Sequence, residues 1–252
     1  MRAWRCSAKE ASPAMCGRFA RHRDRKSYAR ALGVPVEGLP DDAPAWKPAY
    51  NVCPGTEIPI VRQLPGGHAS FARLLWGLVP NWAKDPKAGN RHVNARAETA
   101  AEKPSFRRLL QNRRCLVPAD AYYEWKAVPG GKAPYCFRRV DGAPFFFAAL
   151  WDAWQSFDGM QELETFVTFT VAPNRLAARV HERMPVIVRP EDHAAWLDPS
   201  LRDTSRIAHV LATYPDGELA AYPVDPAVSR PAASGAGLIE ATGPELEDTT
   251  AR

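Results

Sequence analysis

Residues 135–151 read YCFRRVDGAPFFFAALW, and this stretch decides the fold. Two runs rich in aromatic and apolar residues, 135–140 and 145–150, are separated by a break that contains Ala143 and Pro144. Both runs have the length of a strand and fall far short of the roughly 18 apolar residues that a membrane helix needs. The stretch therefore predicts β-structure at the centre of the protein.

Runs of the same kind flank this stretch on both sides. Each carries β-branched or aromatic residues and is bounded by proline or glycine, which is the pattern of short strands. Besides the two runs above, we expect strands over residues 58–62, 71–79, 115–117, 166–171 and 186–188.

Helical patterns are fewer and irregularly placed. Pro104 and Pro173 mark two helix starts, and Asn174 is suited to be the N-cap of the second. Because strands and helices do not alternate regularly, the pattern does not favour a doubly wound parallel sheet. The sequence instead predicts a single α+β domain with a mainly antiparallel, barrel-like β-sheet flanked by short helices. The expected helices cover residues 105–112, 174–180, 191–197 and 203–213.

Composition excludes several classes of protein. The 252 residues are 46% hydrophobic and 24% charged, which are values of globular proteins and not of wholly disordered ones. Arg2, Arg5 and Lys9 interrupt any apolar segment of a secretory signal, so we expect a cytoplasmic protein with no membrane partner. The five cysteines are odd in number and lack Cys-x-x-Cys spacing, so neither a disulfide framework nor a metal site is expected.

Local composition suggests where the domain begins and ends. Residues 1–14 are polar and charged without periodicity, and are expected to be a leader or a mis-annotated start. Residues 35–55 hold five prolines and are expected to be irregular. The folded domain is expected over residues 16–240, followed by a disordered acidic tail at 241–252.

Charge is distributed unevenly along the chain, whose net charge is +5. Residues 1–30 hold nine Lys or Arg against two acids, whereas residues 201–252 hold four Arg against eight acids. This asymmetry is compatible with a polyanionic partner on one face. A solvated surface with a basic bias would give the same numbers, so charge alone leaves the partner open.

Six short segments carry residues suited to chemistry or ligand binding. They include one cysteine near the start, a carboxylate between aromatic residues, a histidine before Met-Pro and several arginines. In chain order they are MCGRF at 15–19, YNVCPGT at 50–56, WGLVPNW at 76–82, VNARAET at 93–99, YYEWK at 122–126 and HERMP at 181–185.

In this order the six segments resemble the SOS response-associated peptidase (SRAP, YedK-like) family, over residues 16–239. The resemblance implies the compact α+β fold of that family and a role in the DNA damage (SOS) response near the nucleoid. It also implies binding of single-stranded DNA, without a cofactor. It further implies a covalent thiazolidine link between an N-terminal cysteine and an abasic site. Autoproteolysis that uncovers the cysteine is an older proposal for the family.

Chemistry supports a role for Cys16 independently, provided that its nitrogen is free. An abasic site exposes an aldehyde when its sugar opens, and an α-amine, with a pKa of about 7.7–8.0, is far more often neutral at pH 7 than a lysine amine. The thiol can then close a five-membered ring. Cys16 becomes residue one if translation starts at Met15 or if the preceding residues are cleaved, and both explanations are open. Without a free amine, Cys16 reads as a small buried residue.

Three residues are expected to assist Cys16. Alternation on a strand puts Glu124 on the face opposite Tyr123 and Trp125, where an apolar setting would raise its pKa for proton transfer. His181 suits acid–base work, and the resemblance gives Asn94 the task of orienting the cysteine and the sugar. The alternatives are an exposed, ion-paired carboxylate for Glu124, a helix C-cap for His181 and a turn or cap residue for Asn94.

Five further residues are expected to contact DNA. Arginines close to the nucleophile would hold the phosphates that flank the lesion, although each could instead form a salt bridge, with Glu98 or Asp120 for example. Flat or apolar side chains in loops would stack on bases of any sequence, whereas Trp76 is expected in the core. The arginines are Arg18, Arg96 and Arg183, and the stacking residues are Pro54 and Trp82.

Two other functions compete with covalent trapping. A cysteine peptidase or autopeptidase would use Cys16 as a thiolate together with His181. A non-catalytic binder of single-stranded DNA would hold its ligand through phosphate contacts that salt screens completely. We expect a monomer in each case. Cys53, in place of the alanine usual in the family, and Ser229, after Val228, depart from the family pattern, so no contact is assigned to the end of the domain.

Overall fold

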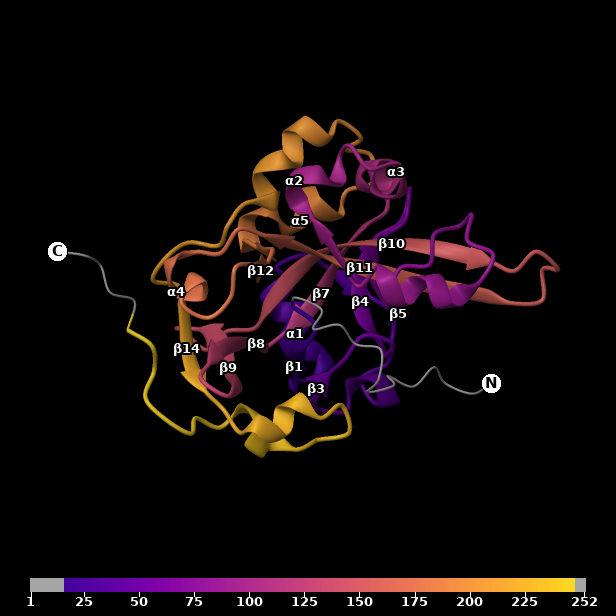
Figure 1. The fold of residues 1–252 in the computed structure, drawn as a ribbon. Helices are drawn as coiled ribbons and strands as arrows, with labels where there is room; N and C mark the ends of the chain where they lie inside the picture. The colour runs from indigo at the N-terminus through magenta and orange to yellow at the C-terminus, as the bar shows by residue number, and fades with distance from the viewer. Residues whose placement is uncertain (1–15, 248–252) are drawn as a thin grey trace.

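The computed structural model describes residues 16–247, so the expected leader at 1–14 lies outside the described residues. Figure 1 shows the arrangement of the strands and helices. The strands are β1 (Phe19–Arg21), β2 (Val36–Glu37), β3 (Ala49–Val52), β4 (Glu57–Gln63), β5 (Ala69–Trp76), β6 (Asn94–Arg96), β7 (Arg114–Ala119), β8 (Ala121–Val128), β9 (Gly131–Arg139), β10 (Phe145–Gln155), β11 (Glu162–Val171), β12 (Met184–Pro185), β13 (Ile187–Val188) and β14 (Leu219–Pro223). The α-helices are α1 (Arg25–Leu32), α2 (Ala97–Ala100), α3 (Pro104–Asn112), α4 (Arg175–Ala178) and α5 (His193–Leu197). The 3₁₀ helices are η1 (Pro44–Trp46), η2 (Pro86–Arg91), η3 (Pro190–Asp192), η4 (Thr204–Leu211), η5 (Pro226–Ser229) and η6 (Ala236–Ile239).

A closed barrel of five strands forms the centre of the fold. Its strands follow the order β11, β10, β7, β4 and β5, and a parallel pairing of β5 with β11 closes the ring. The other four pairings are antiparallel. Strand β10 is buried along its first eight residues because both of its faces are covered. The expected α+β fold with a mainly antiparallel, barrel-like sheet is thus confirmed.

A second sheet packs against the barrel, with the strand order β14, β9, β8, β1 and β3. Phe19 of β1 places its ring 5.3 Å from that of Trp76 and 5.6 Å from that of Phe147, both on the barrel. The opposite face of this sheet buries Tyr123 and Cys136 beneath the chain that follows β14. Strand β1 and the first four residues of β8 are therefore covered on both faces. We call the contact of Phe19 with Trp76 and Phe147 the seam between the two sheets.

The observed helices agree in part with those expected from the sequence. Helix α3 begins at Pro104 and buries Phe106, Leu109 and Leu110 on one face, as expected. Asn174 caps α4 by accepting the N–H of Ala177, but that helix ends earlier than expected. Within the expected helix 203–213, residues 204–211 form the 3₁₀ helix η4, and the expected helix 191–197 divides between η3 and α5. Strand β3, in the proline-rich region, and helix α1 had no periodic signal, and β3 is extended because it pairs with β1.

The expected disordered tail is wrong for residues 241–247. The N–H groups of Thr242 and Leu246 donate to the carbonyls of Pro223 and Ala221, so this segment runs beside β14. Glu245 forms an ion pair with Arg138 at 2.8 Å. The acidic composition had suggested a loose tail, but the acidic side chain of Glu245 binds Arg138 of the sheet. Residues 248–252 lie outside the described residues.

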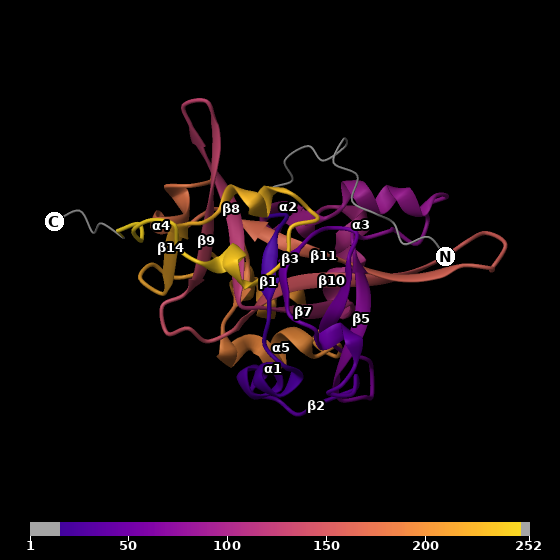
Figure 2. The same ribbon diagram turned by 90° about the horizontal axis from the view of Figure 1, so that it is seen from below.

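Between residues 16 and 247, no helix has both the length and the apolar character that a membrane crossing requires. A long β-hairpin of β10 and β11 extends beyond the barrel, and the hairpin of β8 and β9 extends in another direction (Figures 1 and 2).

Candidate active site

Cys16 lies at the seam between the two sheets, just before β1. Its side chain is 7% exposed, and its backbone φ of 51° falls in the left-handed region. Residues other than glycine adopt this conformation rarely, and such strain is concentrated at functional sites. The turn at Cys16 directs its backbone nitrogen toward β8.

That nitrogen donates a hydrogen bond of 2.6 Å to the Oε1 atom of Glu124. The contact follows from the register of β1 and β8, in which Phe19 pairs with Tyr122, two residues before Glu124. Glu124 is only 4% exposed, so the alternative of an exposed, ion-paired carboxylate is wrong. Burial is the main cause of its raised pKa, and the charge of His181 acts in the opposite direction.

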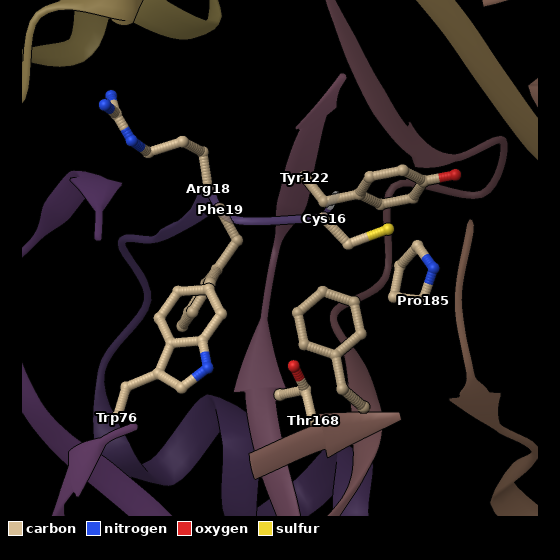
Figure 3. A pocket seen from close by; sticks show the side chains of 8 residues that line it. Cys16, Arg18, Phe19, Trp76, Tyr122, Thr168 and Pro185 are labelled. Atoms are coloured by element: carbon tan, nitrogen blue, oxygen red, sulfur yellow. The ribbon is translucent and has the colours of Figure 1, made fainter. Parts of the chain in front are cut away.

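A small cavity of about 10 Å³ adjoins Cys16, which is room for roughly one water molecule. Figure 3 shows the Cys16 sulfur beside the ring of Tyr122 and near Pro185, with the hydroxyl of Thr168 directed toward the same space. Arg18 points away from this space. Most of the side chains that line the cavity are aromatic or apolar, namely Phe19, Trp76, Tyr122, Phe147 and Pro185.

This environment keeps the Cys16 thiol protonated. Burial raises the thiol pKa well above its ordinary value, and the neighbouring charge of Glu124 raises it further, whereas Arg183 lowers it by a smaller amount. A thiolate would have to form without water and beside a carboxylate. The arrangement therefore favours chemistry in which the thiol reacts as S–H after another group has attacked.

Asn94 lies on β6, which pairs with β11 in parallel and places Asn94 opposite Thr168. The Thr168 hydroxyl donates to the Oδ1 atom of Asn94 over 2.6 Å. Thr168 also lines the cavity at Cys16, so β11 brings Asn94 to the edge of the site.

His181 follows the end of α4, and its own N–H donates to Ala177. Its Nδ1 atom accepts the backbone N–H of Arg183 at 3.1 Å. The same Nδ1 atom lies 3.3 Å from the carbonyl oxygen of Arg183, so the role of each ring nitrogen depends on the tautomer. The charge of His181 acts on Glu124, so the structure brings these two proton-transfer candidates together.

Arg183 is held in place by an ion pair with Glu98, which was the alternative considered for the arginines from the sequence. Its two terminal nitrogens contact both carboxylate oxygens, at 2.7 and 2.8 Å, and one of them also donates to the carbonyl of Thr170. This contact lowers the pKa of Glu98 to about 2. Arg96, on β6, is exposed, and no carboxylate among residues 16–247 pairs with it.

Arg18 is fixed by the end of the domain, where the sequence assigned no contact. It donates to the carbonyl of Val228 at 2.6 Å, to that of Ser229 at 3.2 Å and to Asn51 at 3.0 Å. The hydroxyl of Ser229 accepts the indole N–H of Trp125. Arg18 binds backbone carbonyls, which every residue has, so this contact does not require the residue that is usual in the family at position 229. The departure at Ser229 was therefore no reason to leave this segment without a contact.

Trp82 and Pro54 lie in loops, and neither is among the residues that line the cavity at Cys16. Trp82 is 69% exposed, in a loop anchored where the indole N–H of Trp154 donates to the carbonyl of Ala83 at 2.6 Å. Trp76 is in the core, as expected. Within residues 16–247, no group of three or more His, Cys, Asp or Glu side chains could hold a metal ion.

Sequence reasoning missed Thr168 and Tyr122, which line the cavity. Thr168 had a signal, because it is a polar residue within an apolar strand. Tyr122 had none, because an aromatic residue on a strand is usual in any core.

Comparisons with known proteins find similar sequences over most of this chain. Residues 15–231 match the family model described as SOS response associated peptidase (SRAP). Over 227 residues the chain is 37% identical to the abasic site processing protein YoqW of Bacillus subtilis, covering 90% of this chain and 99% of the relative. It is 32% identical to the abasic site processing protein YedK of Escherichia coli, over 90% of this chain and 99% of that protein.

Solved structures are similar as well. A protein from Bacteroides thetaiotaomicron superposes with a TM-score of 0.76 and 26% identity, covering 90% of this chain and 100% of that chain. A phage-related protein from Bordetella bronchiseptica gives a TM-score of 0.65 and 30% identity, over 83% of this chain and 94% of the other.

Proposed function

Because the chain belongs to the SOS response-associated peptidase (SRAP) family, we propose that it processes abasic sites in single-stranded DNA by forming a covalent link through Cys16. The names of its relatives support action on abasic sites. The observation that carries the proposal is the 2.6 Å contact between the Cys16 nitrogen and Glu124, beside a buried thiol. The link would shield the lesion from strand cleavage.

The reaction begins when Cys16 has a free amine, by removal of the residues before it. The amine attacks the aldehyde carbon of the opened sugar, water leaves and a C=N bond forms. The Cys16 sulfur then bonds to the same carbon, and the thiol proton passes to the nitrogen. One aldehyde and one aminothiol thus give one thiazolidine ring and one water molecule.

Glu124 and His181 supply proton transfer for these steps. Glu124 lies within hydrogen-bond distance of the attacking nitrogen and can take a proton from it. Burial raises its pKa, which helps the same carboxyl to hold that proton and return it to the departing hydroxyl. His181 serves as the second acid–base group, which donates a proton toward the sugar and helps its ring to open.

In this proposal, arginines bind the phosphates of the DNA strand, and two loop side chains stack on its bases. Arg96 is exposed and free of ion pairs with the described residues, so it contacts a phosphate directly. Arg18 and Arg183 contribute positive charge from fixed positions, Arg183 in competition with Glu98. Trp82 and Pro54 stack on bases without reading their edges, which suits a lesion that occurs in any sequence.

The test is denaturing gel electrophoresis after the protein is mixed with single-stranded DNA that carries one abasic site. A product that survives heat and detergent is expected for the wild type. Cys16→Ala and Cys16→Ser both keep the backbone amine and lack the thiol, so each should lose the stable product and leave only an imine that reverses unless it is reduced. No stable product with the wild type would contradict the proposal.

The two alternative functions, a cysteine peptidase and a non-catalytic DNA binder, require other properties of the protein. A cysteine peptidase needs the thiolate of Cys16, and the pKa of this thiol is raised by burial and by Glu124. Blocking the amine would leave a peptidase active on an unrelated substrate, whereas crosslinking would stop. A non-catalytic binder would release DNA completely at high salt.

A further inference from the structure

Thr168 has a hydroxyl whose hydrogen bonds are restricted by its neighbours. It lies on β11, is almost fully buried and lines the cavity at Cys16 (Figure 3). Its oxygen is 2.6 Å from Oδ1 of Asn94 and 3.3 Å from the carbonyl oxygen of Val93. A hydroxyl has one proton, so it can donate to only one of these two acceptors.

The carbonyl of Val93 already has two donors. The indole N–H of Trp76 donates to it at 2.9 Å, and the backbone N–H of Thr168 does so at 3.2 Å. A carbonyl oxygen has two lone pairs, and both are thereby used. The Thr168 hydroxyl proton is therefore directed to Asn94, which is also the nearer acceptor.

We propose that Thr168 is a positioning residue that binds the carboxamide oxygen of Asn94 and so presents the amide –NH₂ group to the abasic sugar beside Cys16. Asn94 then acts as a hydrogen-bond donor, and its ligand is an oxygen atom of the opened sugar. Parallel pairing of β6 and β11 fixes both residues on strands, which hold side chains more accurately than loops. This inference rests on the proposed function.

The first test compares Thr168→Val, which keeps the shape and removes the hydroxyl, with Thr168→Ser, which restores it. The crosslinking rate should fall about tenfold or more in the valine variant, because the amide is no longer aligned, and should recover in the serine variant. Thr165→Val is the matched control. Thr165 is a buried residue of the same strand, and its hydroxyl accepts the N–H of Val79 at 2.9 Å, away from Asn94.

A second readout is independent of activity. The side-chain –NH₂ signals of Asn94 in an NMR spectrum, assigned by their loss in Asn94→Asp, should shift in Thr168→Val and stay in place in Thr165→Val. Unchanged signals in Thr168→Val, or an equal loss of rate in the two valine variants, would overturn the inference. If the wild type forms no crosslink, the proposed function fails, and the NMR signals alone decide whether Thr168 holds Asn94.

A third variant covers the case in which Thr168→Val does not fold. Asn94→Asp keeps the side-chain shape and an oxygen for Thr168, but it has no donor. Crosslinking should be lost in this variant at a pH where the carboxyl is ionised. Normal crosslinking by Asn94→Asp would contradict the donor role.

Discussion

The Oε1 atom of Glu124 lies 2.6 Å from the backbone nitrogen of Cys16, which precedes it by 108 residues in the chain. Pairing of β1 with β8 produces this contact, because it brings the chain just before β1 beside Glu124. The contact is buried, which strengthens it and raises the pKa of the carboxyl. Several consequences can be measured.

Replacing Glu124 by Gln should slow crosslink formation by about 10²–10⁴-fold, the usual range for the loss of a general acid or base. Glutamine keeps the shape and can still accept the Cys16 N–H, so the fold and DNA binding should persist. Single-turnover rates from quenched denaturing gels check this. A variant as fast as the wild type would remove Glu124 from the mechanism.

The same variant should change how stability depends on pH. Because the pKa of Glu124 is raised on folding, the native state binds more protons than the unfolded state between the ordinary pKa and the raised one. The contribution of Glu124 to the free energy of unfolding therefore falls as pH rises through this window and is constant above it. Glu124→Gln lacks this fall, so it should gain stability over the wild type as pH increases.

Urea unfolding at intervals from about pH 4 to pH 8 measures this difference. Glu102→Gln, which changes an exposed carboxyl, is the control and should follow the wild type. A stability difference between Glu124→Gln and the wild type that is constant across the whole range would contradict the argument.

Glu98→Gln should tighten binding of single-stranded DNA. Its carboxylate occupies Arg183, and with a pKa of about 2 it remains charged at neutral pH and competes with phosphate. Removing the charge frees the guanidinium, so the plot of log K against log salt should steepen by about 0.7 if one phosphate contact is added. Fluorescence anisotropy with an undamaged oligonucleotide measures both effects.

Two controls accompany that measurement. Arg183→Gln should weaken binding, whereas Arg206→Gln, at an exposed arginine of η4, should leave it unchanged. If Glu98→Gln binds DNA no better than the wild type, Arg183 does not contact phosphate.

Trp82→Ala should weaken DNA binding by about 1–3 kcal/mol, the loss of one stacked base. The side chain is 69% exposed, so little folding energy depends on it and the variant should unfold at the wild-type temperature. Trp82→Phe should keep most of the affinity. Anisotropy at fixed salt checks the prediction, and equal affinities for alanine and tryptophan would exclude Trp82 from the DNA surface.

Local patterns in the sequence predicted much of this fold. The run at 145–150 lies within β10, and Pro104 starts α3, because short-range propensity and tertiary packing agree there. Closure of the barrel by parallel pairing of β5 and β11 had no local signal, since it joins residues far apart. The segment 241–247 was misjudged because its partners, Pro223 and Ala221, are backbone groups that composition does not reveal.

In the site, too, local sequence patterns predicted some features, and contacts between distant residues decided the others. Alternation correctly put Glu124 on the face opposite Tyr123, but only the structure reveals that this face meets Cys16. The hold of Glu98 on Arg183 was one of several pairings open from the sequence. The role of Thr168 depends on which acceptors around it are already occupied, and no sequence pattern contains that information.

The central claim is that Cys16 reacts through a free backbone amine and its own thiol. The most direct test is the intact mass of the product formed on abasic single-stranded DNA by a chain that begins at Cys16, compared with the same chain acetylated at that amine. The free chain should give a heat-stable adduct whose mass is that of protein plus DNA less one water molecule, and the acetylated chain should give none. An equal yield of adduct from the acetylated chain would contradict the account.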